Sequence, residues 1–152
     1  MAKKPAPVPL LQLDNQLCFA VYSTGHAFNR VYKPLLDRLK LTYPQYLAML
    51  VLWEQDNVPV KDIGDRLFLD SGTLTPLLKR LEAAELIKRT RSKEDERQVL
   101  IELTPQGEAL REKAKSVPQS ILAASACSVG ELVAMKDEIV ALRDRLNAVL
   151  GE

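Results

Sequence analysis

The sequence predicts a mainly α fold: a winged helix-turn-helix with a small β-hairpin wing, and with N- and C-terminal helices that form a dimerisation interface. Three observations predict it. Two short helical patterns, 61–68 and 71–84, follow each other across a tight turn. A stretch with strand-like alternation comes next, at 87–103. Long amphipathic helical patterns occupy both ends of the chain.

Composition limits the possible classes of protein. The chain has 152 residues, of which 47% are apolar and 27% charged, as is typical of one soluble globular domain, 1–152. The longest apolar run, 46–53, is far shorter than the roughly 20 residues of a membrane span. Prolines replace the apolar core of a signal peptide in 1–10, so we expect a cytoplasmic protein. The net charge of +1 argues at face value against a nucleic-acid partner.

The first long helix is predicted to begin near Leu17, because apolar residues recur from there in steps of four and three. Asp14 or Asn15 is expected to supply its N-cap. Pro34 lies inside the pattern, and its missing amide is expected to kink or end the helix near Tyr32.

The segment 44–103 is predicted to form the winged helix-turn-helix, a DNA-binding region. A helix at about 44–55, capped by Thr42, is apolar on nearly all sides and belongs in the core. The two short helices follow, and the second carries leucines at i, i+3, i+4 and i+7 that hold it against the domain. The alternating residues of 99–103 then pair with 87–91 across a charged turn to form the hairpin.

The C-terminal part is predicted to form two more helices. Pro105 begins a helix that runs to about Ala126 and that Pro118 is expected to bend. Ser128 opens the last helix as its N-cap, because Glu131 follows three residues later. The apolar residues of this last helix form a heptad seam.

That seam has two interpretations. It packs on the chain's own core, as most amphipathic helices do, or it pairs with a second copy of the chain. Both ends of the chain are long and amphipathic, which favours the second interpretation. The sequence therefore predicts a homodimer, with 10–40 and 105–150 as dimerisation helices.

The inventory of reactive residues argues against most enzymes. His26 is the only histidine and has no serine nucleophile pattern near it. Cys18 and Cys127 lie too far apart in the sequence for a clustered metal motif, and no glycine-rich phosphate loop is present. We expect no metal, no cofactor and no enzymatic activity.

The second short helix and the hairpin carry the strongest functional signal. The helix presents small hydroxyl and basic side chains away from its leucines, as a helix in a major groove requires. The hairpin adds cations, and Arg97 is placed to enter a minor groove while Asp95 holds it by an ion pair. A merely solvated charge run is the alternative interpretation of these cations. The candidate DNA-binding residues are Asp70, Ser71, Thr73, Thr75, Lys79, Arg80, Arg89, Lys93, Asp95 and Arg97.

Several segments resemble a known family. They are similar to the MarR family of dimeric winged-helix transcriptional regulators, and more narrowly to its organic hydroperoxide resistance regulators of the two-cysteine type. The similarity covers nearly the whole chain and is weakest before Leu10 and after Pro118. The segments are LDNQLCF at 13–19, YKPLL at 32–36, LTYPQYL at 41–47, DSGTLTPLLKR at 70–80 and DERQVLIELT at 95–104.

The resemblance implies a repressor that releases pseudo-palindromic double-stranded operator DNA when an organic hydroperoxide oxidises its N-terminal cysteine, here Cys18. It also implies that Tyr32 and Tyr43 of one subunit hydrogen-bond that sulfur in the other. Physical reasoning agrees, because the first turn of a helix favours a thiolate, the form that attacks peroxide. Tyr22 lies one turn further on the same face, whereas Tyr32 lies about 21 Å along the helix and must come from a partner.

Cys127 is expected in a loop just before the last helix, where it could resolve oxidised Cys18 as a disulfide. A buried structural cysteine is the alternative interpretation of Cys18. Two other functions stay open at this point: a MarR-type repressor released by a non-oxidising phenolic ligand, and a thiol peroxidase.

Overall fold

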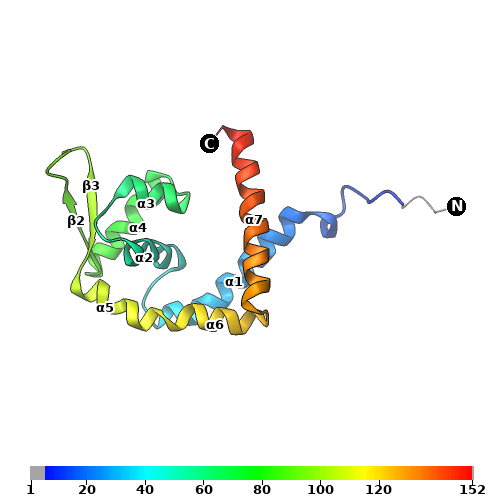
Figure 1. The fold of residues 1–152 in the computed structure, drawn as a ribbon, viewed down its shortest axis with the longest axis horizontal. Helices are drawn as coiled ribbons and strands as arrows, with labels where there is room; N and C mark the ends of the chain where they lie inside the picture. Colours follow the sequence, from blue (N-terminus) through cyan, green and yellow to red (C-terminus); the bar gives the residue numbers. More distant parts are fainter. Residues whose placement is uncertain (1–5, 152) are drawn as a thin grey trace. The chain divides into compact units, whose positions relative to one another are not determined.

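The computed structural model describes residues 6–151 (Figure 1). Residues 1–5, part of the segment that argues against a signal peptide, lie outside the described range. The chain divides into two compact units, Met1–Glu112 and Lys113–Glu152. The elements in chain order are η1 (Leu13–Asn15), α1 (Leu17–Asp37), α2 (Tyr43–Glu54), β1 (Val58–Pro59), α3 (Val60–Leu67), α4 (Ser71–Ala83), β2 (Ile87–Arg91), β3 (Val99–Leu103), α5 (Pro105–Ala114), α6 (Ser116–Ser125) and α7 (Val129–Leu150).

Helix α1 begins at Leu17 as predicted, but its cap and its length differ from the prediction. The N-cap is Gln16, whose side chain makes no capping bond, while Asp14 and Asn15 belong to the 3-10 turn η1. The helix also continues through Pro34 to Asp37. Proline removes one helical hydrogen bond, and the carbonyl that it frees belongs to the exposed residue Arg30, where water can satisfy it.

Helix α2 forms the centre of the core of the first unit. Thr42 and Gln45 make a reciprocal capping box at its start, as the sequence indicated for Thr42. Half of its twelve residues are buried, and Met49 is fully enclosed. The indole Nε1 of Trp53 donates a 3.0 Å hydrogen bond to the carbonyl oxygen of Gly107, which fastens the start of α5 to this core.

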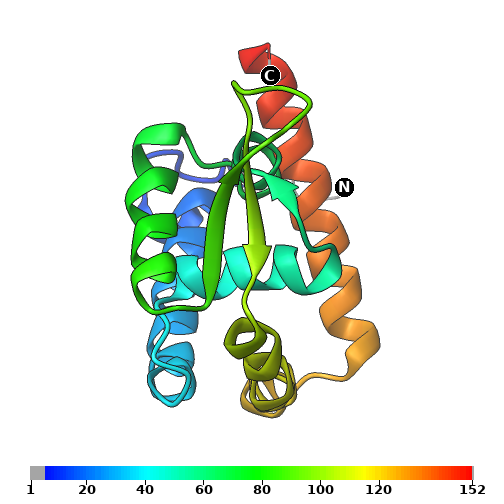
Figure 2. The same cartoon turned by 90° about the vertical axis from the view of Figure 1, so that its left-hand side faces the viewer.

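The winged part contains one strand more than predicted. Strands β2 and β3 form the antiparallel hairpin with the predicted bounds, and their register pairs Ile87 with Leu103. The third strand, β1, pairs with β3 so that the order is β1-β3-β2. Strand β1 is only two residues long and contains Pro59, so it is too short to show the alternation by which a strand is predicted from sequence. Figure 2 looks onto the hairpin, with α4 beside β2.

Helices α3 and α4 form the helix-turn-helix. The four leucines of α4 at helical spacing are all buried, which holds this helix against the domain. Pro76 lies inside α4, and the helix continues across it from Ser71 to Ala83. Phe68 ends α3 in the left-handed conformation, with φ of 55°, and lets the chain turn into α4.

The predicted helix from Pro105 to about Ala126 is in fact two helices. The break falls at Lys115, between α5 and α6, rather than at Pro118. A proline ring clashes with the carbonyl four residues before it, here that of Ala114, so the interruption precedes Pro118 by one turn. Helix α7 begins after Ser128 with the predicted capping box to Glu131.

Within the described residues, no single helix is long and apolar enough to cross a membrane, although the bent pair Pro105–Ser125 and Val129–Leu150 reaches that length and composition jointly. The same part of the chain has no group of three or more His, Cys, Asp or Glu side chains that could hold a metal ion.

Candidate DNA-binding surface and thiol site

Helix α4 exposes the polar side chains that the sequence predicted for it. Ser71, Thr73, Lys79 and Arg80 are exposed, and Thr75 is half-buried. These polar residues lie between the buried leucines in the sequence of the same helix. The hydroxyl groups are in its first turns, and the cations follow about one turn later. This arrangement suits base edges near the helix start and phosphates further along.

Asp70 has a structural role at the start of α4. Its Oδ1 accepts a 2.8 Å hydrogen bond from the backbone amide of Thr73, so Asp70 is the N-cap of this helix. That bond holds the pKa of the Asp70 carboxyl below its ordinary value. The cap fixes the first turn of α4 and therefore the position of the hydroxyl groups that follow. Asp70 thus contributes to the candidate DNA-binding surface indirectly, by holding those hydroxyl groups in place.

The tip of the wing is held by side chains that accept hydrogen bonds from backbone amides. Ser92 Oγ accepts from the amides of Glu94 and Asp95 at 3.2 and 3.3 Å. Asp95 Oδ1 accepts from the backbone amide of Arg97 at 3.0 Å. Among the described residues, no ion pair joins Asp95 to the Arg97 guanidinium, which corrects the expected contact. Aspartate two residues before an amide forms such a turn readily, and this leaves the guanidinium exposed.

The other cations of the hairpin are partly neutralised. Arg89 Nε lies 3.4 Å from a carboxylate oxygen of Glu82, and Lys88 Nζ lies 3.0 Å from one of Glu102. Lys93 is exposed at the tip of the wing. Arg91 of β2 donates to a backbone carbonyl instead, that of Glu96 at 3.4 Å, so this contact does not offset its charge.

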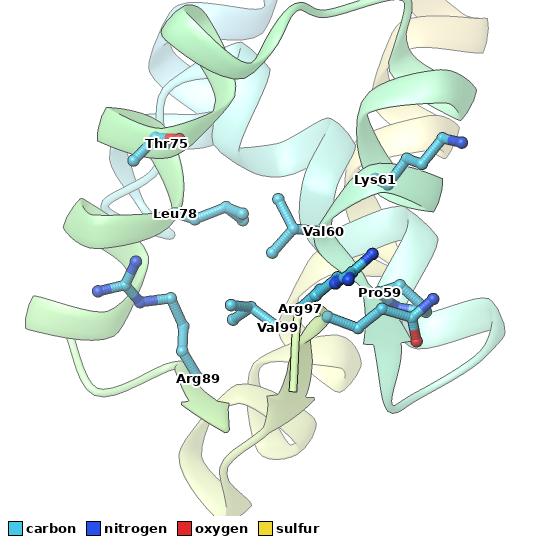
Figure 3. A pocket seen from close by; sticks show the side chains of 9 residues that line it. Pro59, Val60, Lys61, Thr75, Leu78, Arg89, Arg97 and Val99 are labelled. Atoms are coloured by element: carbon cyan, nitrogen blue, oxygen red, sulfur yellow. The ribbon is translucent and has the colours of Figure 1, made fainter. Parts of the chain in front are cut away.

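A pocket of about 360 Å³ lies between the helix-turn-helix and the wing (Figure 3). Val60, Leu78 and Val99 point toward one another in it. Lys61 and Pro59, which sequence reasoning did not include, contribute to its lining because α3 starts directly after β1. The lining residues are Pro59, Val60, Lys61, Thr75, Leu78, Arg89, Arg97, Gln98 and Val99.

Cys18 is the second residue of α1, and it is exposed. The side chain of Gln16, the N-cap, turns away from the helix and donates to the carbonyls of Leu10 and Gln12 at 2.6 and 3.0 Å. The N-cap side chain therefore does not cap the first amides of α1, the turn to which Cys18 belongs. The exposed thiol excludes the alternative of a buried structural cysteine within this chain.

Two of the predicted tyrosines lie together, and a third joins them. The ring centroids of Tyr32 and Tyr43 are 4.8 Å apart, and Tyr46 lies 6.0 Å from Tyr32. Burial, followed by the neighbouring Tyr43 and Tyr46, raises the pKa of Tyr32 to about 12. Burial also raises the pKa of Tyr43 and of Tyr46. The Tyr32 hydroxyl therefore stays protonated, and a hydrogen-bond donor, at neutral pH.

Cys18 and Tyr32 belong to one continuous helix, so about 21 Å of helix axis separates them. Tyr22 is not part of the tyrosine cluster, because its ring packs edge-on against His26 with centroids 4.4 Å apart. Sequence reasoning missed Tyr46, although it lies one turn after Tyr43 in the segment LTYPQYL.

Cys127 lies in the loop between α6 and α7, as predicted, and is half-buried. Its thiol donates to the carbonyl oxygen of Ser125 at 3.3 Å, and its amide donates to Ser125 Oγ at 3.2 Å. Ala126, between them, is left-handed with φ of 52°.

The comparisons with known proteins fit this geometry. Residues 30–115 match the family model described as transcriptional regulator SarA/Rot. The chain is 52% identical to the HTH-type transcriptional regulator TtmR of Methylorubrum extorquens (strain PA1), covering 91% of this chain and 71% of the relative. It is 50% identical to the organic hydroperoxide resistance transcriptional regulator of Bacillus subtilis (strain 168), covering 90% and 93%.

Solved structures of AbfR, a protein of Staphylococcus epidermidis, are also similar. Reduced AbfR bound to DNA is 36% identical with a TM-score of 0.77, and the match covers 91% of this chain and 94% of that one. Disulfide-formed AbfR is 38% identical with a TM-score of 0.63, covering 86% and 91%. The winged helix-turn-helix and these relatives together show that the chain belongs to the SarA/Rot and MarR type of winged-helix transcriptional regulators, and one of its relatives is an organic hydroperoxide resistance regulator.

Proposed function

We propose that this chain is a dimeric transcriptional repressor that binds operator DNA when reduced and releases it after an organic hydroperoxide oxidises Cys18. A peroxide-detoxification gene is then derepressed. The observation that carries the proposal is the exposed Cys18 thiol in the uncapped first turn of α1. The chain that carries this thiol is 50% identical to a regulator named for organic hydroperoxide resistance.

Operator DNA binds to α4 and the wing in this proposal. The exposed hydroxyl groups and cations of α4 enter the major groove, and Arg97 reaches an adjacent minor groove. Cations from α3, from β2 and from the turn before β3 line the pocket, which supports contact with a backbone phosphate; they are Lys61, Arg89 and Arg97. Such a regulator works where its operator is, in the cytoplasm.

The switch is a two-step oxidation. The Cys18 thiolate attacks the distal oxygen of the hydroperoxide, so that an S–O bond forms, the O–O bond breaks, and the alkoxide leaves and takes up a proton as an alcohol. The Cys127 thiolate then attacks the Cys18 sulfenic sulfur, an S–S bond forms and the oxygen leaves as water. Tyr32 and Tyr43 of the other subunit donate hydrogen bonds to the reacting Cys18 sulfur.

Homodimerisation is supported by apolar side chains that the single chain leaves exposed. On α1, Leu17 is 63% exposed, and on α7 Ile139 is 53% exposed. Burying such surface stabilises an interface by about 25 cal/mol per Å². The exposed apolar residues include Leu17, Val21, Phe28 and Val31 on α1, and Met135, Ile139, Leu146 and Val149 on α7.

A second candidate function is release by a non-oxidising small anionic or phenolic ligand. The pocket between α3, α4 and the wing favours it, because its lining combines apolar side chains with the cations Lys61, Arg89 and Arg97. A ligand of this kind would act equally on wild type and on Cys18→Ser. We do not propose a thiol peroxidase, because α4 and the wing would have no role in that reaction.

The DNA-binding part is tested by selecting duplexes from a random library with the reduced protein. A two-fold dimer selects a pseudo-palindrome with half-sites about one helical turn, or a multiple of it, apart. Arg97→Ala is expected to weaken binding to the selected duplex in fluorescence anisotropy. If Arg97 contacts phosphate, the log–log salt slope also falls by about 0.9. Arg111→Ala on α5 is the control. Selection of unrelated sequences, or an Arg97→Ala variant that binds as wild type, would count against this surface.

A further inference from the structure

Tyr46 is the most buried member of the tyrosine cluster, with 3% of its surface exposed. Its ring centroid lies 6.0 Å from that of Tyr32 and 6.4 Å from that of Tyr43. Tyr43 and Tyr46 stand one turn apart on α2, whereas Tyr32 comes from α1. The three rings therefore join the two helices, with Tyr46 on the core side.

Tyr32 has aromatic neighbours from both helices. Phe28 lies one turn earlier on α1, with its ring centroid 6.5 Å from that of Tyr32. Tyr43 and Tyr46 contact Tyr32 from α2. A side chain packed in this way can change its rotamer only if its neighbours move. Tyr46 is enclosed in a close-packed core and resists that movement more than the half-buried Tyr43 does.

We propose that Tyr46 is a positioning residue that holds the hydroxyl groups of Tyr32 and Tyr43 where they meet the reactive Cys18 of the other subunit. The inference rests on the proposed function, because it concerns what holds the tyrosine donors of the same thiol site in place. Hydrogen-bond donors accelerate a reaction when they are fixed in place before it occurs, and a core aromatic ring can supply that rigidity.

The electrostatics of the cluster agree with this role. Tyr43 and Tyr46 both raise the pKa of Tyr32, and burial is the largest contribution. Loss of the Tyr46 ring would admit water beside Tyr32 and leave its ring free to rotate. The donors would then reach the Cys18 sulfur less often, and the thiolate would lose part of its stabilisation.

The test compares Tyr46→Leu and Tyr46→Phe in a Cys127→Ser background, where oxidised Cys18 cannot be resolved. The rate of Cys18 oxidation by cumene hydroperoxide is followed as the dimedone adduct by mass spectrometry, between pH 5 and 9. Tyr46→Leu is expected to lower the second-order rate constant by about tenfold, or roughly 1.4 kcal/mol in the barrier, and to move the pH–rate profile to higher pH. Tyr46→Phe keeps the ring and is expected to retain the rate within about twofold.

Leu52→Ala is the matched control, because Leu52 is a buried residue of α2 outside the ring cluster. It should lower stability without moving the pH–rate profile. A Tyr46→Leu variant that reacts as wild type, a Tyr46→Phe variant as slow as Tyr46→Leu, or an equal effect of Leu52→Ala would overturn the inference. If Tyr46→Leu does not fold, Tyr46→Met takes its place as the variant without a ring, and its rate is compared with that of Tyr46→Phe. Absence of any Cys18 adduct in the unsubstituted Tyr46 protein would contradict the proposed function instead.

Discussion

The aromatic rings of Tyr32 and Tyr43 lie with their centroids 4.8 Å apart, although Tyr32 belongs to α1 and Tyr43 to α2. The contact depends on the last turn of α1, which continues past Pro34 and buries Leu36. It also depends on the Thr42 capping box, which fixes the first residue of α2. Two features of local backbone chemistry thus bring together the rings of two tyrosines whose hydroxyl groups the sequence motifs placed in separate segments.

Removing one of these hydroxyl groups should slow the chemistry at Cys18. Tyr32→Phe keeps the ring contacts but lacks the donor, so we expect the rate of Cys18 oxidation by cumene hydroperoxide to fall by about tenfold. Stopped-flow or quenched-flow labelling of the thiol measures this rate. Tyr46→Phe is the matched control, because it removes a hydroxyl group from the same ring cluster but not one of the two proposed donors to Cys18. An unchanged rate in Tyr32→Phe would remove Tyr32 from the thiol site.

Gly107 allows the start of α5 to approach the backbone of the winged unit. A Cβ at this position would overlap the carbonyl oxygen of Leu86, and Gly107 also accepts the Trp53 indole hydrogen bond. Gly107→Ala is therefore expected to lower the free energy of unfolding by about 3 kcal/mol, measured by urea denaturation with Trp53 fluorescence. Gly25→Ala is the control, since nothing lies within 4 Å of the added methyl group there. Equal stability of Gly107→Ala and wild type would contradict the close approach.

The charge of Asp70 should make stability depend on pH in a defined window. Its folded-state pKa is depressed by the hydrogen bond from the Thr73 amide. A depressed carboxyl pKa adds stability that is complete above the unfolded pKa, about 3.9, and that is lost as the pH falls below it. Asp70→Asn keeps a capping side chain but has no charge. The difference in melting temperature between wild type and Asp70→Asn should therefore close as the pH falls from 6 to 2.5, and a constant difference would refute the capping account.

Cys127 should be required for the covalent product of oxidation. One equivalent of cumene hydroperoxide is expected to convert wild type into a disulfide-linked dimer on a nonreducing gel, because a sulfenic acid condenses with an available thiol. The Cys127 thiol first leaves its hydrogen bond to the Ser125 carbonyl. Cys127→Ser should stay at monomer mass while Cys18 is still oxidised. A covalent dimer that persists in Cys127→Ser would exclude this pairing.

Much of the fold could be predicted because local signals and tertiary structure agree. The capping boxes at Thr42 and Ser128 and the alternation in β3 are short-range patterns that the structure keeps. The predictions of the fold that were wrong concern residues whose conformation depends on contacts with other segments. Gln16 takes the cap position from Asp14 and Asn15 because its amide bonds the preceding segment.

The site was predicted unevenly for a similar reason. Exposed residues of α4 follow from helical periodicity, and so their positions were correct. Lys61 and Tyr46 were missed because each gains its place through a contact with a distant segment. Asp70 and Asp95 were recognised, but as side chains near DNA, whereas the structure uses both as acceptors of backbone amides. Short acidic residues at turns and helix starts often have that second use.

The central claim is that oxidation of Cys18 releases DNA, and one measurement tests it directly. Fluorescence anisotropy with the duplex selected by the reduced protein compares wild type and Cys18→Ser, each before and after one equivalent of cumene hydroperoxide. The account predicts that oxidised wild type loses at least tenfold in affinity and regains it with dithiothreitol, while Cys18→Ser binds equally well in both conditions. Wild-type binding that is insensitive to the hydroperoxide, or release of Cys18→Ser to the same extent, would contradict it.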